Sequence, residues 1–526
     1  MRRVFGMETE YSVVMETKSD CKYPFGKGFG ASVLLDKLDW AILKPYALQS
    51  RNLQRLCVRR EQKSSMSFGG VISYWIGATG ARVYGDMEDA VLEYASPECD
   101  SIEGVMQADK GGERIVEMLK DIHRSGRYRA AGDAHDDARC FIFKNNSDCI
   151  RGRSVRSSSF WGSHENYEMP AQLMPIRYLG ASGIFERSPF VHALASLLAV
   201  RPVLTGAGGL YFDVPAGEWR YAVSPRGLVT KSLYSSRCDM SPKPMVMFKD
   251  ECDSHTGYIR LQIPVGESNM LPESLRFRFA FVSAFLHFWE DGGSERFSEL
   301  PLFEFPTDAL ETVSRDCELS EKLILGQRRS SCTAIDVLLE WTLIFLRYID
   351  VSCRRDELRE EYEILARAYS LLEAAEKNPE ALVNETDWGL KYSLLTAHCD
   401  KKGVGFDDIR SRFIDLWYSE TSPTGLYNAW QRKAVRDPFC EEELHEIVWA
   451  HAAAPRAELR KRYVKALARR DQKMDRYHGW IFFESPRGPD PESELIPVSD
   501  PLVKTAPRDI IARIEKLEQS PDEPVQ

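Results

Sequence analysis

The stretch "GMETEYSVV" (residues 6–14) reads as a β-strand that carries two carboxylates. Alternate side chains of a strand share a face, so Glu8 and Glu10 face one side while Thr9 and Tyr11 face the other. Two carboxylates about 7 Å apart on one face repel each other unless a positive charge lies between them. A solvated face on an edge strand and a divalent metal site both explain this pattern, and the stretch alone leaves both interpretations open.

A second acidic cluster follows in "GARVYGD" (80–86) and "AVLEYAS" (90–96), which read as two strands joined by a short turn. Tyr84 and Asp86 share a face of the first strand, and Glu93 returns on the second. The pair therefore directs a phenol and two carboxylates toward one volume. A polar sheet face without a ligand has the same pattern.

A third and a fourth cluster add an imidazole and a guanidinium. "GSHENYE" (162–168) places His164 on a strand, and "YIRLQIPVGESNM" (258–270) places Arg260 on another. Several oxygen ligands with one imidazole suit Mg²⁺ or Mn²⁺ better than zinc. An arginine beside a magnesium site can bind phosphate oxygens, although a surface salt bridge is the commoner use of a single arginine.

The bulk properties exclude several classes of protein. The chain has 526 residues, 43% of them hydrophobic and 28% charged, and a formal net charge of −10, so whole-molecule attraction to nucleic acid or to an anionic membrane is not expected. Its start reaches Glu8 before any apolar segment forms, which is unlike a signal peptide, and no apolar run approaches the length of a membrane span. The 12 cysteines are scattered without a C-x-x-C pair, which favours reduced thiols and a cytoplasmic location.

The order of elements predicts an α+β fold. Alternating strand-like segments fill the first half of the chain and helical periodicity dominates later, as in an antiparallel sheet with helices on one face. Besides the segments quoted above, strands are expected at 139–147, 208–214, 218–224, 244–250 and 257–265, and helices at 31–44, 103–123, 188–200, 272–290, 332–349 and 355–376.

Two regions stand apart from this pattern. Residues 15–79 form a long mixed insertion, which is either a lid beside the site or an inert surface excursion. We predict a main domain over 1–400 and a smaller, mainly helical C-terminal domain over 401–526, with a basic helix at 456–473 and a disordered tail. The basic helix is either a docking surface for an acidic partner or a solvated helix face.

Several motifs together resemble one family. "RRVFGMETEYSV", "GARVYGDMEDAVLEYASPECD", "KNNSD…GSHENYE" and "YIRLQIPVGESNM" have the order and spacing of motifs in the Pup ligase and Pup deamidase/depupylase family, which is related to glutamine synthetase. "DWGLKYSLL", "LWYSE", "WQRKAVRDPF" and "APRAELRKRYVKAL" extend the resemblance to the C-terminal part. The resemblance covers nearly the whole chain except 15–79. It implies a curved antiparallel sheet backed by helices, which holds ATP and Mg²⁺.

The resemblance also implies roles for particular residues. By motif, Asp86 is similar to the catalytic aspartate of the family. The implied metal ligands are Glu8, Glu10, Tyr84, Glu93 and His164, and the implied cofactor-binding residues are Arg226, Arg260, Ser268 and Asn269.

The implied activity is ATP-dependent joining of the C-terminal glutamate carboxylate of a Pup-like modifier to target lysines. "GMETEY" and "SPECD" are closer to the ligase, whereas the length of 15–79 is closer to the hydrolase. The chain departs from the family in "DMEDAVLEY" and at Gln262, where the family has a histidine. A depupylase or deamidase of the same fold, a non-catalytic nucleotide-binding relative and a small-molecule carboxylate–amine ligase therefore stay open as alternatives.

Overall fold

The computed structural model describes residues 3–16, 58–62, 72–76, 78–86, 91–124, 139–147, 161–173, 188–235, 243–249, 258–326, 331–434 and 455–469, together with 511, 512 and 515. The predicted helix at 31–44, most of the 15–79 insertion and the predicted disordered tail lie outside these residues.

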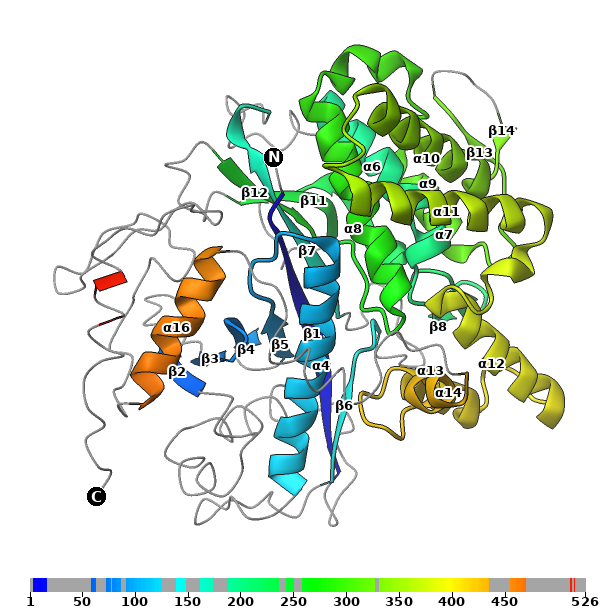
Figure 1. The fold of residues 1–526 in the computed structure, drawn as a ribbon. Coiled ribbons are helices and arrows are strands. Elements are labelled where there is room, and N and C mark those ends of the chain that lie inside the picture. The colour runs from blue at the N-terminus through cyan, green and yellow to red at the C-terminus, as the bar shows by residue number, and fades with distance from the viewer. Residues whose placement is uncertain are drawn as a thin grey trace.

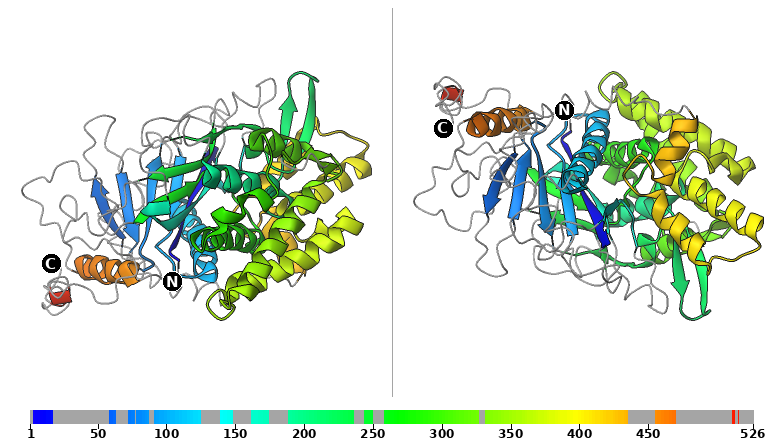
Figure 2. Two further views of the ribbon diagram at one scale, coloured as in Figure 1. Left: turned by 90° about the horizontal axis from the view of Figure 1, so that it is seen from above. Right: turned by 90° about the horizontal axis from the view of Figure 1, so that it is seen from below.

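A ten-stranded sheet forms the centre of the described chain, with the order β10-β11-β12-β7-β1-β5-β4-β3-β2 and with β6 paired to β1 (Figures 1 and 2). The long central strand β1 pairs with β7 through its first half, with β5 through its middle and with β6 through its second half. All strand pairs of this sheet are antiparallel except β10 with β11. The strands are β1 (Phe5–Glu16), β2 (Val58–Gln62), β3 (Ile72–Ile76), β4 (Ala81–Asp86), β5 (Val91–Ala95), β6 (Arg139–Phe143), β7 (Ser163–Pro170), β10 (Thr230–Tyr234), β11 (Lys243–Lys249) and β12 (Tyr258–Ile263).

The two faces of the sheet differ in polarity, as the alternation in β1 predicts. Met7, Thr9 and Tyr11 are buried beneath helices, whereas Glu8 and Glu10 on the opposite face are partly exposed. Because register fixes which side chains share a face, the polar face of β1 continues into the polar faces of its neighbours.

Helices α4 (Ile102–Arg124), α6 (Pro189–Val200) and α8 (Pro272–Glu290) cover the apolar side of the sheet (Figures 1 and 2). Gly112 allows α4 to approach closely, because a Cβ at this position would lie 2.6 Å from the Tyr94 ring of β5. A glycine inside a helix costs about 1 kcal/mol relative to alanine, and here it permits direct packing of the helix on the sheet.

The remaining elements are mainly helical, and most of them follow the last strand of the sheet in the chain. None of the described helices is both long enough and apolar enough to cross a membrane. They are α7 (Pro202–Thr205), α9 (Pro306–Arg315), α10 (Ala334–Val351), α11 (Arg359–Lys377), α12 (Asp387–Lys402), α13 (Ile409–Tyr418), α14 (Leu426–Ala434), α16 (Pro455–Arg469), the 3₁₀ segments η2 (Ala171–Leu173), η4 (Arg226–Leu228), η6 (Gly293–Glu299) and η7 (Pro379–Leu382), and the two-stranded pairs β8 (Gly209–Asp213) with β9 (Glu218–Ala222) and β13 (Leu323–Ile324) with β14 (Ser331–Cys332).

The predicted α+β architecture, an antiparallel sheet backed by helices, is confirmed. Two parts of the sheet were not predicted. β2 and β3 belong to the 15–79 segment and extend the sheet at its edge, so this part of the segment is integral to the sheet. β10 was missed because "TKSLY" is short and follows a 3₁₀ turn. The division of the chain near 401 stays a prediction.

A buried ion cluster attaches α16 to the sheet. Glu98, which follows β5, accepts hydrogen bonds from Arg456 (2.8 Å) and Arg460 (2.8 and 2.9 Å), and all three side chains are buried. Arg460 also donates to the Gly80 carbonyl at the start of β4. Burial alone would raise the pKa of Glu98, but Arg460 and Arg456 outweigh it and lower the pKa to about 2. The cluster therefore fastens the C-terminal helix beside the strands that carry Tyr84 and Glu93.

Because of this ion cluster, part of the stability of the folded chain should be lost in acid. Because the pKa of Glu98 is lower in the folded chain than in the unfolded one, its contribution is complete above pH 4.5 and is lost as pH falls toward 2. We expect Glu98→Gln to lower the free energy of unfolding by about 3 kcal/mol at pH 7. At pH 3.5 the difference in free energy of unfolding between variant and wild type should be smaller by about 1 kcal/mol.

Urea unfolding at several pH values measures this difference. Glu458→Gln is the control, because Glu458 lies on the same helix and is exposed while it pairs with Lys461. The control should differ from wild type by less than about 0.5 kcal/mol at every pH. If the difference in free energy of unfolding between Glu98→Gln and wild type is the same at pH 6 and pH 3.5, the charge of Glu98 contributes nothing to stability.

Candidate active site

Four neighbouring strands place the predicted catalytic and metal-ligating residues on one face. In the β1–β7 pairing Glu8 lies opposite His164, and in the β1–β5 pairing Glu10 lies opposite Glu93. In the β4–β5 pairing Glu93 also lies opposite Tyr84, and Asp86 comes two residues further along β4. Since opposed residues of paired strands point to the same face, the register alone brings these side chains together.

Two groups of ligand atoms are close enough to share a cation. One group is formed by Glu8, Glu93 and His164, and the other by Glu10, Asp86 and Glu93. Within each group one potential ligand atom per residue lies within 4.8 Å of the others. Glu93 belongs to both groups and is only 3% exposed, so it stands at the centre of the cluster.

The electrostatics of the cluster show an excess of negative charge. Burial, followed by the charges of Glu8, Asp86 and Glu10, raises the pKa of Glu93 well above its usual value. Burial and the neighbouring Glu93 likewise raise the pKa of Tyr84. Closely spaced carboxylates of this kind become stable in the ionised form when a cation lies among them.

Two arginines border the acidic cluster. Arg260 of β12 donates to Glu8 Oε1 at 2.9 Å and to Asn166 Oδ1 at 3.3 Å. The buried Arg226 lies 3.1 Å through Nη2 from His164 Nε2. The other ring nitrogen of His164, Nδ1, faces Glu8 Oε2 at 3.6 Å. The predicted arginines therefore reach the predicted metal ligands directly.

Gly162 makes room for Arg226. A Cβ at this position would lie 2.6 Å from the guanidinium carbon of Arg226. The Gly162 amide donates to Glu10 Oε2 at 2.7 Å, while its carbonyl accepts from the Glu10 amide at 3.0 Å. Gly162 was part of a quoted sequence motif but was given no role. Its amide orients the Glu10 carboxylate, and its lack of a side chain leaves space for the Arg226 guanidinium.

Ser268 and Asn269 lie one layer behind the cluster. The Ser268 hydroxyl donates to the Gly162 carbonyl at 3.4 Å, and its amide donates to Asn146. Asn269 is fully buried, and its side chain bonds to protein groups of Thr205, Asp387 and Arg278. This placement suits positioning of the loop better than contact with a ligand, so their predicted cofactor-binding role stays a prediction.

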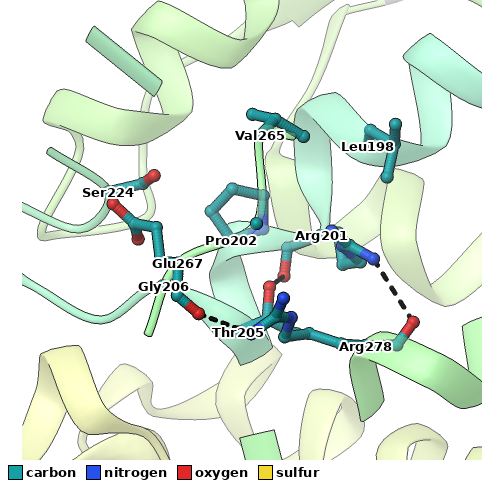
Figure 3. A pocket seen from close by; sticks show the side chains of 10 residues that line it. Leu198, Arg201, Pro202, Thr205, Gly206, Ser224, Val265, Glu267 and Arg278 are labelled. Carbon is teal, nitrogen blue, oxygen red and sulfur yellow. Dashed lines mark hydrogen bonds between the residues drawn. The ribbon is translucent and has the colours of Figure 1, made fainter. Parts of the chain in front are cut away.

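Buried ion networks hold the loops around the site. On the helix side of the sheet, Glu165 pairs with Arg201 (2.7 Å) and Arg278 (3.1 Å). These two arginines and Glu267 line a small polar cavity, in which Glu267 and Ser224 lie on one side and the arginines on the other (Figure 3). Glu267 in turn accepts the backbone N–H of Arg226 at 2.8 Å. The residues around this cavity therefore help to hold Arg226 in place from behind the site.

A second buried network lies beneath β1. Lys144, which is fully buried, donates to Asp109 (2.5 Å), Glu113 (2.8 Å) and the Asn269 carbonyl (2.9 Å). Asp109 and Glu113 both belong to α4, so one lysine joins the end of β6, α4 and the loop after β12. These partners were not predicted, because charged residues far apart in the chain give no local signal of pairing.

Comparison with known proteins agrees with this arrangement. The model of the Pup-ligase protein family matches residues 3–480. The Pup–protein ligase of Xylanimonas cellulosilytica is 28% identical over 489 residues, which cover 91% of this chain and 93% of that protein. The Pup–protein ligase of Sanguibacter keddieii is 27% identical over 488 residues, with coverages of 91% and 92%.

Two solved structures have the same fold. The complex between the prokaryotic ubiquitin-like protein Pup and its ligase PafA gives a TM-score of 0.69 at 21% identity, covering 98% of this chain and 92% of that chain. The Pup ligase PafA in complex with ADP gives a TM-score of 0.65 at 21% identity, with coverages of 92% and 93%. With a family match across most of its length and the fold in common, this chain belongs to the Pup-ligase family.

Proposed function

We propose that this protein is an ATP-dependent ligase that joins the C-terminal glutamate side-chain carboxylate of a Pup-like protein to lysines of target proteins. One observation carries the proposal: the carboxylates of Glu8, Glu10 and Glu93 converge with Asp86 and His164 on one sheet face, and two arginines border them. In a member of the Pup-ligase family, this arrangement suits a nucleotide with its cation next to a catalytic carboxylate.

The residues present fit Mg²⁺. The donors are carboxylate oxygens and one imidazole, which suit a hard divalent cation. Burial, followed by the charges of Glu8, Asp86 and Glu10, raises the pKa of Glu93, and such an ion would offset the repulsion among these carboxylates. Glu8, Glu93 and His164 would hold the ion, with Glu10 and Tyr84 beside them. Bound Mg²⁺ supplies neutralisation of charge on the phosphates during phosphoryl transfer.

Arg226 and Arg260 are proposed to bind the phosphoryl oxygens of ATP. Each guanidinium lies at the edge of the acidic cluster and presents several donors, which suits a planar, multiply charged acceptor. ATP would convert the modifier carboxylate, a poor electrophile, into a γ-glutamyl phosphate. Attack by a lysine amine then forms the isopeptide bond, and phosphate leaves.

Asp86 is proposed as the base for the attacking lysine. An unperturbed lysine has a pKa near 10.4, so only about one amine in a few thousand is neutral at pH 7, at a cost of roughly 4–5 kcal/mol. Asp86 lies at the end of β4, beside Glu10 and Glu93, where a carboxylate could accept the proton from an incoming ammonium.

The direct test incubates the full chain with ATP, Mg²⁺ and a Pup-like protein that ends in glutamate, together with a lysine-bearing target. We expect a target lysine whose mass rises by that of the modifier less one water, and one ADP released per conjugate. Omission of ATP is the control. Cleavage of a preformed conjugate without stoichiometric ATP use would instead identify a hydrolase of the same fold.

The free cysteines among the described residues are consistent with the cytoplasm as the place of reaction.

A further inference from the structure

Gln262 lies at the edge of the acidic cluster and is not assigned a role by the site described above. It belongs to β12, lies opposite Asn166 of β7 and is 3% exposed. Its Nε2 donates to Glu8 Oε2 at 2.8 Å. Within the part of the chain that the structure describes, its Oε1 is buried and accepts no hydrogen bond.

The orientation of this amide follows from its neighbour. Exchanging Oε1 and Nε2 would bring an amide oxygen against the Glu8 carboxylate, so the nitrogen must face Glu8. The same amide therefore contacts Glu8, a member of the group formed by Glu8, Glu93 and His164. Buried acceptors normally have a partner, and an unpartnered one at a candidate cation site points to a ligand.

We propose that Gln262 supplies a neutral oxygen ligand to the divalent cation held by Glu8, Glu93 and His164, while its Nε2 fixes the orientation of Glu8. This inference rests on the proposed cation site. A carboxamide oxygen is a hard ligand that suits Mg²⁺ and Mn²⁺, and it adds no further negative charge to a cluster that already contains four carboxylates. Gln262 thereby favours hard cations over metals that prefer nitrogen or sulfur.

Two substitutions at Gln262 distinguish the role of the amide oxygen from the role of the amide nitrogen. Gln262→Met has nearly the same shape and lacks both polar atoms. Gln262→Glu keeps an oxygen at the same place and removes the donor to Glu8. If the oxygen binds the cation, Gln262→Met should weaken Mn²⁺ binding by about tenfold or more, whereas Gln262→Glu should bind Mn²⁺ at least as tightly as wild type.

Mn²⁺ titrated into the full chain, with free Mn²⁺ followed by electron paramagnetic resonance and Mg²⁺ as competitor, measures these affinities without any turnover. The same substitutions at Gln107 are matched controls, because its Nε2 also donates to a glutamate, Glu103, at 3.4 Å on α4. Gln107→Met and Gln107→Glu should leave Mn²⁺ binding unchanged.

Three results would overturn the inference, and each has a different meaning. Unchanged Mn²⁺ affinity in Gln262→Met would show that the oxygen is not a ligand. Equal weakening in Gln262→Met and Gln262→Glu would show that only the donor to Glu8 matters. A wild-type chain that binds no Mn²⁺ would remove the cation site itself, and with it this part of the proposed function.

Discussion

Asp86→Asn is expected to lower the rate of conjugate formation at pH 7 by at least about 100-fold, with little change in stability. Asp86 is partly exposed at the end of β4 and shares a cluster with Glu10 and Glu93. The substitution keeps the shape of the side chain but removes its negative charge and its ability to accept a proton from a lysine ammonium. The rate of single-turnover conjugation, measured by mass spectrometry, gives the size of the effect.

The pH dependence tells a base from a residue that only supports the fold. Without a base, the reaction depends on the fraction of neutral lysine, which rises tenfold per pH unit below pH 10. Residual activity of Asp86→Asn should therefore rise nearly tenfold per unit between pH 7 and 9, more steeply than that of wild type. Asp121→Asn, at an exposed position on α4, is the matched control and should match wild type. A uniform loss at every pH would argue against the base.

The acidic face of the sheet was predictable from the chain because strand periodicity is a local property. In "GMETEYSVV" the alternation alone places Glu8 and Glu10 away from the core, and the structure confirms it. The hairpin of β4 and β5 was predictable for the same reason, since a short turn makes the two strands neighbours. The order of four motifs then identified the family, which no single motif could have done.

The contacts between distant strands were not predictable in the same way. Gln262 reaches Glu8 across 254 residues, because β12 and β1 flank β7 in the sheet. Its residue type suggested only a departure from the family, and the register of two strand pairs was needed to place its amide. The same holds for Glu98, whose arginine partners lie about 360 positions later, on a helix that the sequence presented as a solvated or docking face.

The buried polar residues on the helix side of the sheet were the hardest to predict from the sequence. Lys144 lies in the strand expected at 139–147 and was given no role, yet it is fully buried and faces two carboxylates of α4. Burial opposes its charge, but Asp109 and Glu113 outweigh burial and raise the pKa of Lys144. The lysine is therefore charged at neutral pH, and the network depends on it.

Lys144→Met should accordingly lower the free energy of unfolding by about 3–5 kcal/mol, which is a large part of the stability of a typical domain. The substitution leaves the carboxylates of Asp109 and Glu113 buried with one fewer cation, and it frees the Asn269 carbonyl in the loop after β12. Urea unfolding followed by tryptophan fluorescence measures the loss.

A triple variant shows whether the unpaired charge is the cause. Adding Asp109→Asn and Glu113→Gln to Lys144→Met removes the buried negative charges and should recover most of the lost stability, because replacing a whole buried ion network costs far less than breaking it. Lys402→Met, at an exposed position near the end of α12, should change stability by less than about 0.5 kcal/mol. If the triple variant is as unstable as the single one, lost packing or hydrogen bonding of the lysine, rather than unpaired charge, destabilises the chain.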